Sequence, residues 1–266
     1  MGTALNHRLD LSFDRREEHF RADPATDALW ERLIGEAKHV CATDPALHAI
    51  ITDAILGKGE FYSALSGLLA HKLRDSILPS SMWETLFAEA RMGCPDLDAT
   101  AQEDLAAVVA RDPATEDILT PFLCYKGFHA LQCHRVGHWL WSQGRCTAAR
   151  IVQSRVSEVF SVDIHPAVSM GRRVFIDHGT GIVIGETAMV GDDVSILQHV
   201  TLGGTGKGRG DRHPKIRDGA LLSANATVLG NIEIGRGATV GAGSVVLKSV
   251  PPFATAVGVP ARTLGG

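Results

Sequence analysis

The second part of the chain repeats an aliphatic residue every six positions. The spacing holds in three runs, which are Ile164, Met170 and Ile176; Ile184, Val190, Ile196 and Leu202; and Ile216, Leu222, Val228, Ile234, Val240 and Val246. A small or β-branched residue stands four positions after most of these anchors, and glycine often follows the anchor directly. A helix with 3.6 residues per turn cannot produce this period, whereas a short strand followed by a corner can. The pattern therefore predicts a solenoid of short strands whose anchors point inward.

The first part of the chain follows a helical pattern instead. Trp30, Leu33, Ile34 and Ala37 have the i, i+3, i+4, i+7 spacing of an apolar stripe. Asp44 before Pro45 is typical of a helix start. The segments Ser81 to Glu84 and Thr100 to Glu103 both have the capping-box pattern, which predicts helices that begin at these points. We expect a helical domain over residues 1–160, with the charged, aperiodic residues 1–20 as a loose arm.

The repeat of the second part resembles the hexapeptide repeat of left-handed parallel β-helices, in which three short strands make one triangular coil. Composition changes at the same point, because 19 of the 28 glycines follow residue 163 and only Phe175 and Phe253 of the aromatic residues do. We therefore predict an α+β protein, in which an all-helical N-terminal domain precedes a left-handed parallel β-helix over residues 161–266.

The repeat is out of register at two points. Ile176 and Ile184 are eight residues apart, and Leu202 and Ile216 are fourteen apart. A solenoid accepts extra residues only at its corners, where they form surface loops. The larger insertion covers residues 203–215 and is polar and rich in glycine. Such a loop is a candidate functional element, although a tolerated insertion is the alternative.

Composition and charge exclude several classes of function. The chain has 266 residues, a formal net charge of −4 and 45% hydrophobic residues. This balance lacks the basic footprint of a nucleic-acid-binding protein. No apolar stretch reaches the roughly 18 residues of a membrane span, and the N-terminus has no secretory apolar region. The five cysteines lie far apart with no Cys-x-x-Cys pair, so we expect reduced thiols and a cytoplasmic location.

Histidines stand at both register breaks. His178 lies in the first, and His213 lies in the inserted loop. Asp163 begins the first predicted coil. An imidazole that holds a carboxylate on one nitrogen can accept a hydroxyl proton with the other. The spacing alone does not show whether Asp163 contacts His178.

No histidine pattern indicates a metal site. His134 and His138 have the i, i+4 spacing that metal ligands use, but no carboxylate arrangement like His-Glu-x-x-His accompanies them. A γ-class carbonic anhydrase also has a β-helix and needs two zinc histidines five residues apart on one coil. His165, His178, His199 and His213 include no such pair. We expect a protein without a metal ion.

The motifs of both halves together resemble serine O-acetyltransferase in order and spacing. In the repeat they are Asp-Ile-His-Pro from Asp163, Asp-His-Gly-Thr-Gly from Asp177, Ile-Leu-Gln-His-Val-Thr-Leu-Gly-Gly-Thr-Gly-Lys from Ile196, Gly-Asp-Arg-His-Pro-Lys-Ile from Gly210 and Gly-Val-Pro-Ala-Arg from Gly258. In the helical half they are Arg-Asp-Pro-Ala from Arg111, Tyr-Lys-Gly-Phe-His-Ala-Leu-Gln from Tyr125 and Gly-His-Trp-Leu-Trp from Gly137. The resemblance is close from about residue 105 to residue 262 and loose before that.

The resemblance implies transfer of acetyl from acetyl-CoA to the hydroxyl of L-serine, which gives O-acetyl-L-serine. It makes His178 the general base and Asp163 the residue that orients it. Asp112 and Asp177 would hold the serine ammonium group, although Asp112 also fits a helix N-cap before Pro113. Arg212 and His213 would hold the carboxylate. These residue types suit the charges that they would bind.

Acetyl-CoA is the co-substrate that the resemblance implies. In this family it lies along the outer coils between neighbouring subunits, and Gly204, Ala224 and Ala242 match positions where a small residue lets pantetheine approach the backbone. Backbone N–H groups of residues 203–206 could stabilise the oxyanion. No cysteine or serine lies in a motif that would carry the acetyl group, so we expect a ternary complex.

The resemblance also implies partners and alternatives. It predicts a homotrimer or a dimer of trimers, and feedback inhibition by L-cysteine. Family members commonly bind O-acetylserine sulfhydrylase through a C-terminal tail that ends in isoleucine, and the present sequence ends at Gly266 without it. We therefore leave that complex open. Another hexapeptide-repeat O-acetyltransferase with a sugar, homoserine or antibiotic acceptor is the alternative enzyme, and a regulatory scaffold is the alternative without catalysis.

Overall fold

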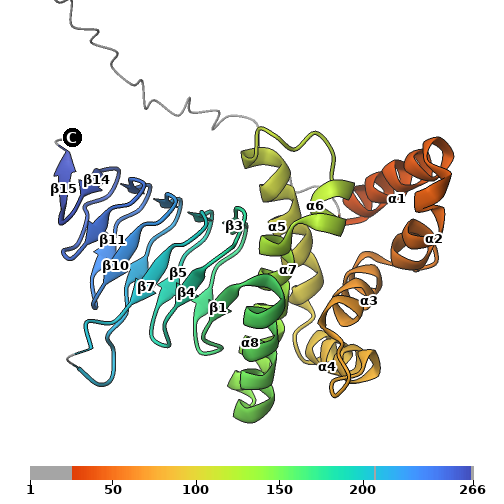
Figure 1. Cartoon of the computed structure of the whole chain (residues 1–266), viewed down its shortest axis with the longest axis horizontal. Helices are drawn as coiled ribbons and strands as arrows, with labels where there is room; N and C mark the ends of the chain where they lie inside the picture. The colour runs from red at the N-terminus through yellow and green to blue at the C-terminus, as the bar shows by residue number, and fades with distance from the viewer. Residues whose placement is uncertain (1–25, 207, 265–266) are drawn as a thin grey trace, which may run out of the picture.

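The computed structural model describes residues 26–206 and 208–264, so the predicted loose arm over residues 1–20 lies outside it. The described chain has two parts that lie side by side, one of helices and one of short stacked strands (Figure 1). The predicted helical domain followed by a parallel β-helix is confirmed. None of the described helices has the length and apolar character needed to cross a membrane.

The helical part includes eight α-helices and two short irregular helices among the described residues. They are α1 (Thr26–Thr43), η1 (Pro45–Leu47), α2 (His48–Ile51), η2 (Thr52–Leu56), α3 (Phe61–Leu73), α4 (Ser80–Gly93), α5 (Asp96–Arg111), α6 (Leu119–Cys124), α7 (Lys126–Ser142) and α8 (Cys146–Phe160). Asp44 caps η1 as predicted, because its side chain accepts a hydrogen bond from the Ala46 amide.

Both predicted capping boxes are wrong. Helix α4 begins at Ser80 after Pro79, so Ser81 already lies in its first turn. Helix α5 begins at Asp96, and Thr100 is a buried residue inside it. Asp96 and Asp98 lie in the first turn of α5, where carboxylates interact favourably with the helix dipole. The start of α5 therefore has Asp96 and Asp98 in place of the cap that was predicted at Thr100.

The strand part forms three parallel sheets, and one of them ends in an antiparallel strand, β15, which pairs with β14. The strands are β1 (Val162–Ile164), β2 (Ser169–Met170), β3 (Phe175–Ile176), β4 (Ile182–Ile184), β5 (Met189–Val190), β6 (Ser195–Ile196), β7 (Thr201–Gly203), β8 (Lys215–Ile216), β9 (Leu221–Leu222), β10 (Thr227–Leu229), β11 (Glu233–Ile234), β12 (Thr239–Val240), β13 (Val245–Val246), β14 (Thr255–Gly258) and β15 (Ala261–Leu264). The sheet orders are β1-β4-β7-β10-β13, β11-β8-β5-β2 and β15-β14-β12-β9-β6-β3.

Strand register shows where the extra residues go. Val183 in β4 pairs with Thr201 in β7, a separation of 18 residues, or three repeats of six. Val162 pairs with Ile182, which adds two residues, and Thr201 pairs with Thr227, which adds eight. The additions equal the two breaks in the hexapeptide pattern. Both insertions therefore leave the coils paired and lie at corners.

A buried ion pair joins the helices to the first coil. Arg135 of α7 donates to both carboxylate oxygens of Asp104 in α5, at 2.8 and 3.0 Å. Arg135 also donates to the carbonyls of Met170 and Gly171, and Asp104 accepts the Val174 amide. Removing one partner of a buried, hydrogen-bonded pair typically costs about 3–5 kcal/mol. This joint fixes α5 and α7 against the start of the β-helix.

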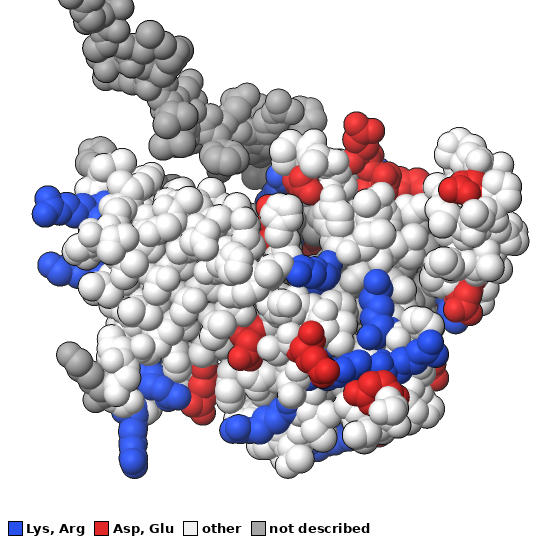
Figure 2. Space-filling view, viewed as in Figure 1, with Lys and Arg blue, Asp and Glu red and all other residues white. Residues whose placement is uncertain are grey.

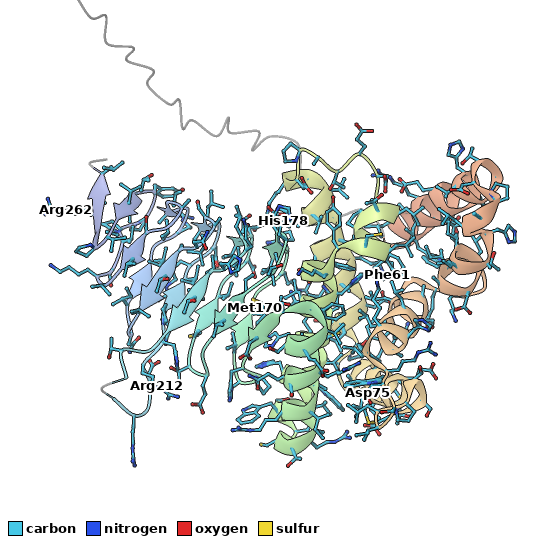
Figure 3. The ribbon with its side chains drawn as sticks, in the orientation of Figure 1. Phe61, Asp75, Met170, His178, Arg212 and Arg262 are labelled. Atoms are coloured by element: carbon cyan, nitrogen blue, oxygen red, sulfur yellow. The ribbon has the colours of Figure 1, made fainter. Side chains whose placement is uncertain are left out.

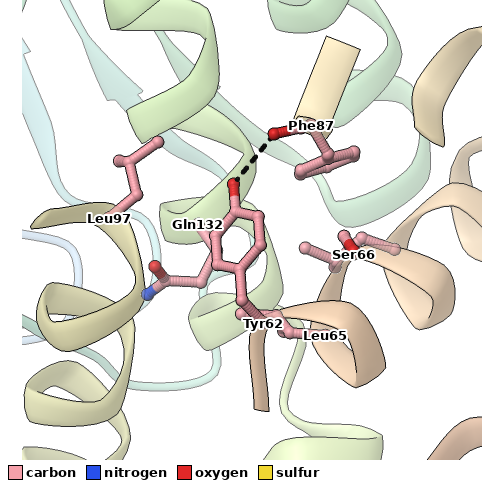
Figure 4. Close-up of a pocket in the computed structure, with 7 residues that line it drawn as sticks. Tyr62, Leu65, Ser66, Phe87, Leu97 and Gln132 are labelled. Atoms are coloured by element: carbon pink, nitrogen blue, oxygen red, sulfur yellow. Dashed lines mark hydrogen bonds between the residues drawn. The ribbon is translucent and has the colours of Figure 1, made fainter. Parts of the chain in front are cut away.

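A small pocket lies inside the helical domain. Its lining is Tyr62, Leu65, Ser66, Leu69, Phe87, Leu97 and Gln132. The Tyr62 hydroxyl donates to the Phe87 carbonyl at 3.4 Å across it (Figure 4). None of the residues predicted to bind substrate or cofactor lines this pocket.

Candidate active site

The two extra residues between β3 and β4 form a tight turn that carries His178. The Gly179 amide donates to the Asp177 carbonyl at 2.6 Å, which closes a three-residue turn with His178 at its centre. His178 has φ 55°, in the left-handed region that non-glycine residues rarely adopt. Its side chain is 72% exposed, with Nε2 3.8 Å from Asp177 Oδ1. The insertion thus turns the imidazole outward, free to contact a substrate.

Asp112 faces this turn from the helical domain. It caps the C-terminus of α5, so the alternative of a helix N-cap is wrong. Its Oδ1 accepts the Ala114 amide at 2.9 Å, and its Oδ2 accepts the Thr115 hydroxyl at 2.8 Å. Partial burial raises the pKa of Asp177, His178 lowers it, and the charge of Asp112 raises it further. A cation placed between the two carboxylates would relieve their repulsion.

Arg212 and His213 lie at a different corner, between β7 and β8. Arg212 donates to Glu186 Oε2 at 2.8 Å, and the carboxylate pKa of Glu186 is lowered by this bond. His213 is buried, and the Thr187 amide donates to its Nδ1 at 3.1 Å. Burial and the Arg212 charge lower the pKa of His213. In the neutral imidazole Nδ1 is therefore an acceptor, and Nε2 carries the proton.

Asp163 does not hold His178 within one chain. It lies in the middle of β1 and accepts a hydrogen bond from Gln153 of α8 at 2.7 Å. No hydrogen bond joins Asp163 to His178 among the residues that the structure describes. Burial lowers the pKa of His165, the charges of Glu186 and Asp163 raise it, and the charge of Arg212 lowers it. Asp163 and Arg212 therefore both lie close enough to His165 to influence its pKa.

The predicted site is divided between two corner edges of the β-helix, which run along the two ends of the strands in the sheet β1-β4-β7-β10-β13. His178 lies in the turn before β4, and Arg212 lies in the loop after β7, at opposite edges of the β-helix (Figure 3). The predicted cofactor residues divide in the same way. Ala224 and Ala242 lie in the corners before β10 and β13, and a hydrogen bond from Gly243 to the Ala224 carbonyl connects these corners. Gly204 lies beside Arg212.

Sequence reasoning gave no role to four residues that contact the predicted site. Thr115 binds Asp112, and Tyr125 binds Thr115. Glu186 binds Arg212, and Thr187 binds the His213 ring. Tyr125 stands in a matched motif, which is a signal, whereas threonine and glutamate at a solenoid corner are ordinary residues. Only three-dimensional contacts distinguish them.

Candidate metal ligands have other partners. His134 Nε2 lies 3.1 Å from the Val168 carbonyl, and His138 Nδ1 lies 2.8 Å from the Pro166 carbonyl. Within residues 26–206 and 208–264, no three histidine, cysteine or acidic side chains gather closely enough to hold a metal ion. His199 packs against Gly181, where a Cβ would lie 2.3 Å from its Nδ1.

A parallel β-helix of hexapeptide repeats with histidines at its corners is the architecture of an acyltransferase class. Residues 29–133 match the family "Serine acetyltransferase, N-terminal", and residues 213–248 match "Bacterial transferase hexapeptide (six repeats)". The serine acetyltransferase of Escherichia coli strain K12 is 51% identical over 239 residues, which cover 90% of this chain and 88% of that relative. The chain belongs to the serine acetyltransferase family.

Solved structures agree with this family. Serine acetyltransferase of Brucella abortus in complex with coenzyme A has a TM-score of 0.88 and 45% identity, covering 89% of this chain and 95% of that one. A serine acetyltransferase in complex with cysteine has a TM-score of 0.87 and 47% identity, covering 89% and 98%. Both similarities extend over the helical domain and the β-helix. This chain is therefore an acyltransferase enzyme.

Proposed function

We propose that this enzyme transfers acetyl directly from acetyl-CoA to the hydroxyl of L-serine, giving O-acetyl-L-serine and CoA. The observation that carries the proposal is the pair of charged corners. Asp112 and Asp177 suit an ammonium group, and Arg212 with the Nε2–H of His213 suits a carboxylate. An amino acid fits this set of groups, whereas a sugar offers neither charge.

His178 is the general base in this proposal. Its imidazole takes the proton of the serine hydroxyl while the oxygen attacks the thioester carbonyl carbon. The carbon–sulfur bond then breaks, and the proton passes from His178 to the sulfur of CoA. His213 is poorly suited to this role, because its Nδ1 accepts the Thr187 amide and its Nε2 already carries a proton.

Two experiments test the activity and the role of the base. Mass spectrometry of acetyl-CoA incubated with L-serine, L-homoserine and a sugar panel should show acetylated L-serine as the main product. At saturating L-serine, His178→Ala should lower turnover by about 100- to 10,000-fold. His213→Ala should act mainly on the Michaelis constant for L-serine. An active His178→Ala beside an inactive His213→Ala would reverse the assignment.

A complete site requires a second copy of the chain. Since His178 and Arg212 lie at opposite edges, adjacent prisms in a homotrimer can bring the His178 edge of one copy to the Arg212 edge of the next. Asp163 would then orient His178 across the interface. Few Lys, Arg, Asp or Glu side chains lie over the β-helix face in Figure 2, and Val183 on β4 is 44% exposed. Such depletion of charge is typical of interface cores. Two trimers joined through helical domains would make a hexamer, and light scattering that shows an active monomer would contradict both.

L-cysteine should inhibit by occupying the serine site. It carries the same ammonium and carboxylate groups as L-serine, and a relative has been solved with cysteine bound. Inhibition should be competitive with L-serine and weaker in Arg212→Ala. Inhibition that is unchanged in this variant would indicate a separate regulatory site.

A further inference from the structure

The hydroxyl of Tyr125 reaches Asp112 through Thr115. Tyr125 Oη lies 2.8 Å from Thr115 Oγ1, which lies 2.8 Å from Asp112 Oδ2. An ionised carboxylate only accepts hydrogen bonds, so Thr115 must use its single proton on Asp112. The Thr115 oxygen therefore accepts the Tyr125 proton. The two hydroxyls form a relay with one direction, from Tyr125 to Thr115 to Asp112.

The relay completes the support of the Asp112 carboxylate. The Ala114 amide holds Oδ1, and Thr115 holds Oδ2, so each oxygen has one protein donor and free lone pairs remain on both. Asp112 lies at the end of α5, where the chain leaves the helix. Without the bond at Oδ2, the carboxylate could rotate about its side-chain torsions. The two bonds together fix the direction of the remaining lone pairs.

Tyr125 is itself anchored next to the His178 turn. It is the residue before α7, and the next two residues contact the chain on either side of His178. Lys126 Nζ donates to the Thr180 hydroxyl. A Cβ on Gly127 would lie 2.1 Å from the Ile176 carbonyl oxygen, so the helix start touches the β3 backbone. The relay thus fixes the position of Asp112 relative to the segment that carries Asp177 and His178.

We propose that Thr115 and Tyr125 are positioning residues that orient Asp112 toward the amino group of the acceptor. This inference rests on the proposed role of Asp112 in binding the serine ammonium group. L-cysteine presents the same ammonium group, so the relay sets the affinity for substrate and inhibitor together. Acetyl-CoA has no contact with Asp112 in the proposed site, and its binding should not depend on the relay.

Steady-state kinetics of Tyr125→Phe and Thr115→Val test the relay. Each change removes a hydroxyl and keeps the side-chain shape. The Michaelis constant for L-serine should rise about fivefold to tenfold, the loss expected for one hydrogen bond. Turnover should change less than twofold, and the Michaelis constant for acetyl-CoA should stay constant. The dissociation constant of L-cysteine, measured by calorimetry, should rise by the same factor as the Michaelis constant for L-serine. Thr115→Ser should restore wild-type values.

The second tyrosine provides the matched control. Tyr62 donates to a carbonyl inside the helical domain, so Tyr62→Phe should leave all these constants unchanged. Thermal melting of every variant checks that the fold persists. If Tyr62→Phe and Tyr125→Phe have equal effects on L-serine, the effect is structural and the proposal fails.

Asp112→Asn separates this inference from the proposed function. If Asp112→Asn leaves the Michaelis constant for L-serine unchanged, the ammonium site itself is wrongly assigned. If Asp112→Asn raises that constant but Tyr125→Phe and Thr115→Val do not, the site stands and the relay fails. Should the relay act through Asp112, adding Tyr125→Phe to Asp112→Asn should have no further effect.

Discussion

At the scale of single residues, the shape of the corner around Arg212 and His213 depends on the absence of a side chain at Gly185. A Cβ on Gly185 would lie 2.1 Å from His213 Nε2 and 2.2 Å from Cδ2. The imidazole therefore lies directly on the Gly185 backbone. Its Nδ1 is held by Thr187, so the ring cannot slide away without losing that bond. The position of the Nε2–H donor follows from both contacts.

Gly185→Ala should therefore disturb L-serine binding without touching the catalytic base. The added methyl group displaces the His213 ring, and loss of a hydrogen bond to a charged carboxylate costs roughly tenfold in affinity or more. We expect the Michaelis constant for L-serine to rise by about this factor, with acetyl-CoA binding retained. Gly208→Ala is the control, because a Cβ there would meet no atom within 4 Å. An unchanged Michaelis constant in Gly185→Ala would show that His213 does not bind the carboxylate.

The sequence indicated the charged residues of the candidate site but not the residues that hold them in place. His178 and His213 stand where the repeat breaks, which distinguishes them from the other histidines. Thr187 occupies a regular repeat position, and nothing along the chain shows that its amide selects the tautomer of a residue 26 positions later. Such contacts depend on the stacking of coils.

At the scale of elements, α7 carries buried histidines that make stability depend on pH. Burial lowers the pKa of His129 to about 4 and that of His134 to about 3, from a model-peptide value of 6.5. At pH values between each folded-state pKa and 6.5, the unfolded chain binds protons at these histidines that the folded chain does not. Stability is therefore full above about pH 6.5 and is lost as the pH falls below it.

Each buried histidine should remove about 2 kcal/mol of stability between pH 7 and pH 5. Urea unfolding at both pH values should show this loss in the wild type. His134→Gln should have a smaller loss, whatever its stability at pH 7. The exposed His71 offers the control variant His71→Gln, which should keep the wild-type slope. Equal slopes in all three proteins would mean that His134 is not the source.

The elements themselves were predictable to different degrees. The period of six predicted the coils and both insertions, because a solenoid repeats the same short strand and corner along its length. Helix starts were less predictable. The segment from Thr100 to Glu103 has a cap pattern, yet Thr100 is buried inside α5, because the core needs that face of a longer helix. Tertiary packing overrides a local cap of about 1 kcal/mol.

At the scale of the whole molecule, the division of the site between two edges has a direct test. At a low concentration of L-serine, neither the His178→Ala enzyme nor the Arg212→Ala enzyme should acetylate the substrate efficiently by itself. In mixed oligomers, some interfaces combine the intact Arg212 edge of one variant with the intact His178 edge of the other. Random assembly of equal amounts makes about a quarter of the sites complete.

Co-expression of the two variants with different tags should therefore restore activity at low L-serine, to about a quarter of the wild-type value in the unselected mixture and about a third in trimers purified through both tags. Oligomers purified through both tags ensure that the chains are mixed. Each variant co-expressed with itself is the control and should keep its own low activity under the same assay. Mixed oligomers without recovery would show that one chain supplies both edges of each site.

This division could have been anticipated only in part. Counting strands places His178 after a third strand and the inserted loop after a first strand, so the sequence implies different corners. It does not show which corners of neighbouring copies meet, because that depends on the surfaces of assembled prisms. Asp163 illustrates the limit, since the expected partner of His178 instead contacts Gln153 within its own chain.

The left-handed backbone of His178 has a conformational cost that glycine would avoid at this turn. In the two-residue insertion, His178 has φ 55° although it carries a Cβ, while its neighbour Gly179 has φ 71° without steric cost. A non-glycine residue in this region typically costs roughly 1–2 kcal/mol, partly offset by the greater freedom of glycine in the unfolded chain. His178→Gly should therefore be inactive and yet unfold at a higher urea concentration than the wild type. Arg173, Asp193 and Asn225 have the same left-handed backbone at other corners, with φ of 53°, 58° and 61°, so this solenoid carries the same local cost at several positions and His178 is one of them.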